Sequence, residues 1–239
     1  MENPALFWLL FAASWAALGY FFWWFLRPSR RLHKVLGDGA RAGLRLIRKN
    51  MPEWSYLPHQ LDPLLGEFGK TYKVGLAYQF AGGEGYLLSA IEVSRRAGKR
   101  EYRRRELVVR RVATGLDSKL SLYAKGGSIQ TPPKFLEKFL AGVLPQGADL
   151  SACLPEFREK FLAFGEKAAL PEPVQRTLLA AMDPNGFDLA RRLKPALDIR
   201  LLPAGIVFPI SFYKRPKRVD EVRRILDFVE ELARGFRFQ

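Results

Sequence analysis

The chain has 239 residues with 48% hydrophobic content, which excludes a disordered or collagen-like protein and allows one or two domains with a buried core. Lysine and arginine outnumber aspartate and glutamate by 39 to 24, so the formal net charge of +15 favours anionic partners such as phospholipid headgroups or nucleic acid. The single cysteine, Cys153, excludes an internal disulfide framework. With His33 and His59 as the two histidines, a zinc site has too few ligands, and we expect no metal and no cofactor.

The strongest feature of the sequence is an uncharged apolar run over residues 5–26. At about 1.5 Å per residue it makes a helix of roughly 33 Å, which predicts a single transmembrane anchor over residues 1–26. The alternative, a buried core helix, seldom runs so far without a charge. No lysine or arginine precedes the run, as would be typical of a cleaved signal peptide, so we expect the run to be retained. The predicted anchor residues are Trp8, Trp15, Trp23 and Trp24.

Basic residues follow the apolar run closely and set the predicted topology. Because positive charge stays on the cytoplasmic side, we expect the N-terminus outside an inner cell membrane and residues 27–239 in the cytoplasm. Residues 27–52 are interpreted as a basic juxtamembrane helix or linker, with helical spacing from residue 31 to about residue 50. Asp38, between two glycines, is a point at which this helix can be interrupted. Its charge either binds anionic lipid or only enforces the topology. The candidate lipid-binding residues are Arg27, Arg30, Arg31 and Lys34.

A second basic segment, residues 95–105, lies between two strand-like runs and is predicted to be a hairpin loop. Such a loop is either solvated or contacts the phosphates of lipid or nucleic acid, and Tyr102 is its one aromatic residue. A smaller basic run at residues 214–218 would join this surface only if the fold brought the two together. The candidate anion-binding residues are Arg95, Arg96, Lys99, Arg100, Arg103, Arg104 and Arg105.

Residues 53–239 are predicted to form one cytoplasmic α+β domain, in which an antiparallel sheet packs against several helices. Residues 53–70 are expected to form a short helix or an ordered loop that leads into it. Strands are expected in a meander at residues 72–80, 86–93, 106–113 and 119–124, and in a later hairpin at residues 199–202 and 206–212. Helices are expected at residues 131–142, 155–164, 173–182, 187–196 and 219–234.

Four segments of the second half, residues 154–157, 161–165, 174–182 and 198–212, follow one another in a recognisable order. This order resembles that of an uncharacterised group of bacterial membrane-anchored proteins, known only as domain of unknown function 3137. Members of that group often have two membrane spans, whereas one is predicted here. The resemblance involves packing residues, so it implies an architecture and no catalytic residues.

No pattern in the sequence indicates catalysis. The glycines at residues 82–85 lack the spacing of a phosphate-binding loop, and Cys153 has no expected histidine partner, so both are interpreted as structural. We therefore expect a non-enzymatic protein that binds a protein partner or the anionic membrane surface. The alternative is a membrane-tethered enzyme or nucleic-acid-binding protein that uses residues 95–105.

Overall fold

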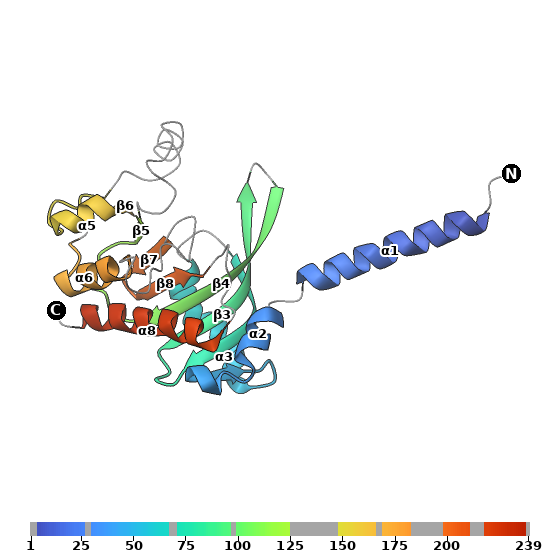
Figure 1. The fold of residues 1–239 in the computed structure, drawn as a ribbon, viewed down its shortest axis with the longest axis horizontal. Helices are drawn as coiled ribbons and strands as arrows, with labels where there is room; N and C mark the ends of the chain where they lie inside the picture. The colour runs from blue at the N-terminus through green and yellow to red at the C-terminus, as the bar shows by residue number, and fades with distance from the viewer. Residues whose placement is uncertain are drawn as a thin grey trace.

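The computed structural model describes residues 4–26, 30–66, 71–96, 99–124, 148–165, 169–182, 198–210 and 218–237. Within these ranges the chain has an α+β architecture, an eight-stranded antiparallel sheet with helices on both faces. Helix α1 (Pro4–Leu26) extends away from this body, and the C-terminal helix α8 (Val219–Phe236) lies along one side of it (Figure 1).

The sheet combines strands from both ends of the chain, in the order β1-β2-β3-β4-β8-β7-β5-β6. The first four strands pair consecutively, as in a meander. The predicted fourth strand of the meander, β5, does not lie beside β4, because the hairpin of β7 and β8 separates them. The strands are β1 (Leu44–Ile47), β2 (Thr71–Phe80), β3 (Gly85–Arg96), β4 (Lys99–Arg111), β5 (Leu120–Ala124), β6 (Phe161–Gly165), β7 (Asp198–Leu202) and β8 (Gly205–Pro209).

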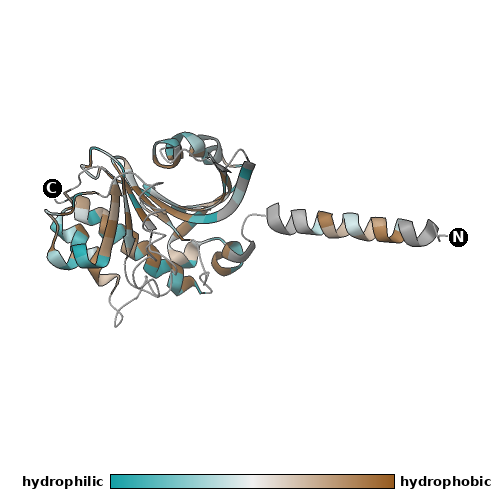
Figure 2. Cartoon of the chain, turned by 90° about the horizontal axis from the view of Figure 1, so that it is seen from above, coloured by the Kyte–Doolittle hydropathy of each residue, from teal (hydrophilic) through white to brown (hydrophobic). Residues whose placement is uncertain are grey.

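Two hydrophobic cores lie on the two faces of the sheet, because successive side chains of a strand point to opposite faces. Leu87 belongs to the larger core, whereas its neighbour Leu88 belongs to the smaller one under α3 (Pro52–Leu65). Figure 2 shows the strands as a curved layer with helices on both sides. The larger core also holds side chains of α2 (Arg30–Leu36), α5 (Pro155–Lys160), α6 (Glu172–Ala180) and α8.

Helix α8 shows why the amphipathic pattern predicted its position correctly. Its buried face includes Val222, Ile225 and Val229, which recur at helical spacing and pack in the larger core. Asp220 and Glu221 lie in the first turn and Arg234 in the last, where each charge is favoured by the helix dipole. The predicted hairpin around residues 203–205 is likewise present as β7 and β8.

Only the first part of the helix predicted from residue 31 to about residue 50 is present. Helix α2 ends at Leu36, and a short 3₁₀ helix (Ala40–Ala42) and β1 follow it. Gly37, Gly39 and Gly43 have φ angles of 59°, 87° and 72°, a left-handed conformation that ends the helix. β1 then pairs with β2, so this basic segment supplies an edge of the sheet.

The helix predicted over residues 155–164 is also wrong in its second half, since α5 ends at Lys160 and β6 begins at Phe161. The spacing of Phe157, Phe161 and Phe164 imitates a helical stripe. In the structure the rings of Phe157 and Phe161 stack at 4.6 Å in the larger core. Phe164 instead lies beside Tyr123 of β5, with ring centroids 5.5 Å apart.

Across the part of the chain that the structure describes, no helix combines the length and apolarity needed to cross a membrane. This finding contradicts the predicted transmembrane anchor. The predicted single-pass location in an inner membrane, with the N-terminus outside and a cytoplasmic domain, is wrong with it.

Several predicted features lie outside the described residues. They are the helices at residues 131–142 and 187–196, residue Arg27, and the basic run at residues 214–218 except for Arg218.

Candidate binding site

The predicted arginine loop is instead a two-stranded ribbon, which corrects the sequence interpretation. β3 and β4 stay in register from the pair Gly85 and Arg110 to the pair Arg96 and Lys99. The charged residues carry no apolar alternation that would predict a strand, yet the backbone pairing continues through them. Figure 1 shows the two strands extending past the rest of the sheet. We call residues 94–96 and 99–104 the basic ribbon.

The basic ribbon concentrates positive charge on a narrow element. It contains six cations and one acid, Glu101, so its formal charge is +5. The register sets Arg95 opposite Arg100, and like charges in opposite positions destabilise a strand pair. Arg100 and Tyr102 are exposed. The cations of the ribbon are Arg95, Arg96, Lys99, Arg100, Arg103 and Arg104.

A buried polar cluster lies at the base of the ribbon. Arg105 Nε is 3.0 Å from Glu92 Oε2, and the two side chains are 22% and 3% exposed. Tyr72 of β2 is the register partner of Glu92. Arg200 Nη1 lies 3.5 Å from Tyr72 Oη, although these residues are far apart in the sequence. We call Tyr72, Glu92, Arg105 and Arg200 the polar cluster.

The electrostatics of the polar cluster keep the hydroxyl of Tyr72 protonated. Burial raises the pKa of Tyr72 above its ordinary value, and the carboxylate of Glu92 raises it further. The guanidinium groups of Arg200 and Arg105 oppose this increase. At neutral pH Tyr72 is therefore a neutral group that can both donate and accept a hydrogen bond.

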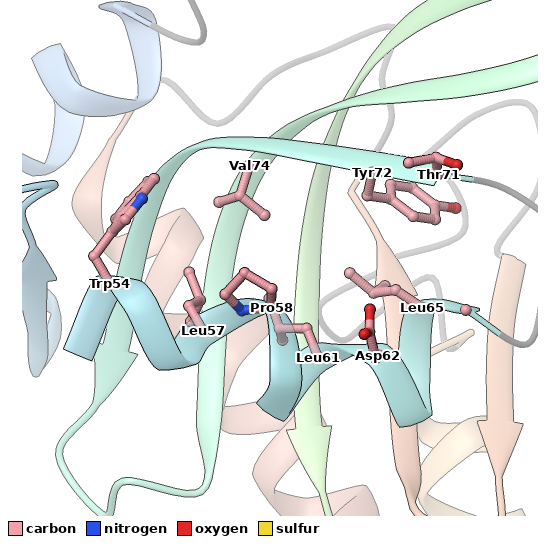
Figure 3. Close-up of a pocket in the computed structure, with 10 residues that line it drawn as sticks. Trp54, Leu57, Pro58, Leu61, Asp62, Leu65, Thr71, Tyr72 and Val74 are labelled. Atoms are coloured by element: carbon pink, nitrogen blue, oxygen red, sulfur yellow. The ribbon is translucent and has the colours of Figure 1, made fainter. Parts of the chain in front are cut away.

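A groove of about 440 Å³ runs between α3 and the first half of β2 (Figure 3). Trp54 lies near one end and Tyr72 near the other, so the groove reaches the polar cluster. Lys49 Nζ lies 5.9 Å from the ring centroid of Trp54. The lining is largely apolar, with Trp54, Leu57, Pro58, Leu61, Leu65 and Val74 beside Asp62, Gly66, Thr71 and Tyr72. We call this pocket the α3–β2 groove.

Sequence reasoning identified the ribbon cations and Arg105 but missed the rest of the site. Tyr72, Glu92 and Arg200 come from three strands, and only the tertiary fold brings them together. One signal was available for Glu92: it alternates with Leu88 and Ala90 along β3, in a position typical of a buried side chain.

The other predicted site residues lie on different elements from the basic ribbon and the polar cluster. Trp8 and Trp15 are exposed on α1, 64% and 63%, and Lys34 is exposed on α2. The side chains of Trp23, Trp24, Arg30 and Arg31 are outside the described set. On α1 the rings of Trp8 and Phe11 lie edge to face, with their centroids 5.9 Å apart.

Groups that could support covalent or metal chemistry are few. Cys153 is buried, and burial raises the pKa of its thiol, so the reactive thiolate is disfavoured. Among the side chains that the structure describes, no three histidine, cysteine, aspartate or glutamate residues are grouped to hold a metal ion.

Comparison with known proteins returned no match to this chain, whether among family models, curated proteins or solved structures. The resemblance drawn from residues 154–212 therefore stays a prediction.

Proposed function

We propose that this chain is a non-enzymatic protein that binds duplex DNA through the basic ribbon. The observation that supports this proposal is the paired register of β3 and β4 through residues 94–104, which places six basic residues on two adjacent strands. Binding to phosphates supplies most of the affinity of such a surface and does not depend on sequence.

The shape of the ribbon favours DNA over RNA. The major groove of B-form DNA is about 12 Å wide and admits a two-stranded β-ribbon. A-form RNA has a deep, narrow major groove that side chains do not read. The exposed side chain of Tyr102 adds a group that can contact the sugar–phosphate backbone.

The base of the ribbon is suited to hold it in one orientation. Glu92 and Arg105 pair directly below it, in the part of the sheet where Leu107 and Val109 are buried. A contact surface supported by regular strands positions its side chains more accurately than a loop does.

The test is binding of the full chain to a short fluorescent DNA duplex as salt is raised. If about four phosphates are neutralised, log Kd changes with log salt with a slope of about 3.6, so affinity falls by about 10²-fold between about 50 and 200 mM salt. The double variant Arg95→Ser, Arg100→Ser removes a facing pair of cations and is expected to reduce this slope by about 2.

The matched control is Lys160→Ser with Arg234→Ser, which removes the same charge from exposed positions of α5 and α8. It is expected to leave the affinity almost unchanged. An equal loss in both double variants would mean that net charge alone drives binding. Equal binding to phosphatidylglycerol vesicles, lost in the ribbon variant, would replace DNA by lipid as the partner and overturn the proposal.

A further inference from the structure

β2 has an open edge over its first half. On one side β3 pairs with β2 from Thr71 to Gln79. On the other side β1 covers only the positions from Ala77 to Phe80, because the chain turns after Ile47 and enters α3. Among the described residues, no strand pairs with this outer side of residues 71–76. An uncovered strand edge presents backbone donors and acceptors to any extended segment that lies beside it.

The α3–β2 groove follows this same edge. Its lining takes Thr71, Tyr72 and Val74 from β2, with Pro58 and Leu61 from α3 (Figure 3). A strand added to β2 would place every second side chain on the face that α3 covers. The groove volume of about 440 Å³ is within the range of pockets that bind ligands in other proteins.

We infer that the α3–β2 groove binds an extended segment of another protein, which adds to β2 as a strand. The segment has apolar residues at alternate positions, which enter the groove, and carboxylates near its ends. Backbone hydrogen bonds to residues 71–76 supply affinity, and the apolar pocket supplies selectivity.

The charges around the groove are the reason for an acidic partner. Lys49 lies beside Trp54 at one end, and Arg200 lies beside Tyr72 at the other. Lys73 is exposed on the open edge itself, whereas Asp62 is the one acid of the lining. Because Arg200 already lies in the polar cluster with Glu92, the charges left for a partner are Lys49 and Lys73 against Asp62, and this excess of cations complements a segment with flanking carboxylates.

The same charges disfavour a second copy of this chain as the occupant. Two copies that paired through residues 71–76 would each bring Lys73 to the shared edge, and like charges across a strand pair destabilise it. The register shift between Val74 and Leu76 further distorts the edge against regular self-pairing. Lysines and bulges on edge strands prevent uncontrolled association while leaving room for a complementary partner.

The experiment selects short peptides from a displayed random library against the full chain, then measures a synthesised peptide by fluorescence anisotropy. We expect selected sequences with alternating apolar residues and flanking acids, and slower amide exchange of residues 71–76 when the peptide is bound. N-methylation of alternate peptide amides is expected to weaken binding at least about tenfold, because it removes strand hydrogen bonds.

Two variants of α3 give a matched pair. Pro58 and His59 are adjacent and exposed, but only Pro58 lines the groove. Pro58→Glu places a carboxylate in the groove and is expected to weaken peptide binding at least about tenfold. His59→Glu adds the same charge outside it and is expected to change the affinity less than about twofold.

Three results would overturn the inference. They are a library that yields no binder, binders that leave exchange at residues 71–76 unchanged, and equal losses in Pro58→Glu and His59→Glu. The ribbon variant Arg95→Ser, Arg100→Ser is expected to bind the peptide normally, so failure of DNA binding and failure of peptide binding are distinguishable.

Discussion

Arg105 and Glu92 form an ion pair on adjacent strands, with Nε and Oε2 3.0 Å apart and the carboxylate almost fully buried. Tyr72 lies beside Glu92 in the register, and Arg200 contacts Tyr72 from a distant strand. The acid therefore balances the Arg105 guanidinium close to the point where the basic ribbon leaves the sheet. Its removal would leave this cation without its ion-pair partner at a largely buried position.

We expect Glu92→Gln to lower the free energy of unfolding by about 2–4 kcal/mol, because Arg105 loses its ion-pair partner at a largely buried site. The partial exposure of Arg105 to solvent limits this loss. The measurement is urea denaturation followed by circular dichroism. Arg176→Gln removes an exposed ion pair with Glu172 on α6 and is expected to cost less than about 0.5 kcal/mol. Equal losses would show that burial does not strengthen the Glu92 pair.

Gly205→Ala is expected to destabilise the chain by about 2–4 kcal/mol. Gly205 opens β8 with a φ of +158°, and a Cβ there would lie 2.2 Å from the backbone oxygen of Arg110 on β4. Neither strand can move without breaking the pairing that joins the two parts of the sheet. Thermal unfolding of the variant measures the loss.

The control is Gly82→Ala, because a Cβ at Gly82 meets no atom within 4 Å. Its expected change in the free energy of unfolding is less than about 0.5 kcal/mol. A stable Gly205→Ala variant would mean that β4 and β8 are not as closely paired as described.

Much of the fold follows from local sequence patterns, and the exceptions share a physical cause. Strand-like runs bounded by turn residues predicted β2 and the β7–β8 hairpin, and the apolar stripe of α8 predicted its position and its buried face. The failures are places where tertiary contact overrides local spacing. Phe161 fits a helical stripe with Phe157 but pairs in a strand, because β5 offers an edge that local spacing cannot indicate.

The candidate site divides in the same way. The positive charge of residues 95–105 was evident from the sequence, but its strand geometry was not, because charged residues carry no apolar periodicity. The polar cluster required the curvature of the sheet to bring Arg200 to Tyr72. The α3–β2 groove is open because β1 ends at Ile47 and leaves the first half of β2 uncovered. The turn into α3 sets this boundary.

Stability is expected to fall between about pH 10 and about pH 12 through Tyr78, whose pKa burial raises to about 12. Tyr78 binds its proton more tightly in the folded state than in the unfolded state, where its pKa has the ordinary value of 10.0. The stability gained from this difference is therefore fully present below pH 10. This stability is lost as the pH rises through the pKa of Tyr78 in the folded state. The hydroxyl donates to the carbonyl of Gly37 at 2.9 Å and lies 3.0 Å from His33 Nδ1.

The measurement compares urea midpoints of the wild type and Tyr78→Phe across this pH range. Tyr78→Phe is expected to be less stable at pH 8, by about 1 kcal/mol for the lost hydrogen bond. Its stability is expected to decline less with pH, so the two curves converge. Tyr102→Phe, at an exposed position, serves as the control and is expected to follow the wild type.

Deletion of residues 1–29 is expected to leave the thermal unfolding midpoint of the body within about 2 °C of the full chain. No described residue of α1 belongs to either hydrophobic core, and the helix extends away from the sheet (Figure 1). Differential scanning calorimetry of both chains measures the difference. A deletion of residues 1–43, which also removes Leu32 and Leu36 from the larger core, is expected to be strongly destabilised.

The position of β8 between β4 and β7 has a consequence for synthesis on the ribosome. The outer edge of β4 is complete once Arg111 has emerged, but its neighbour starts at Gly205, roughly ninety residues later. At about 5–20 residues per second, the nascent meander keeps that edge bare for about 5–20 s. During this interval the growing chain is a candidate client for chaperones that shield strand edges, and slow codons between these two strands would lengthen its exposure.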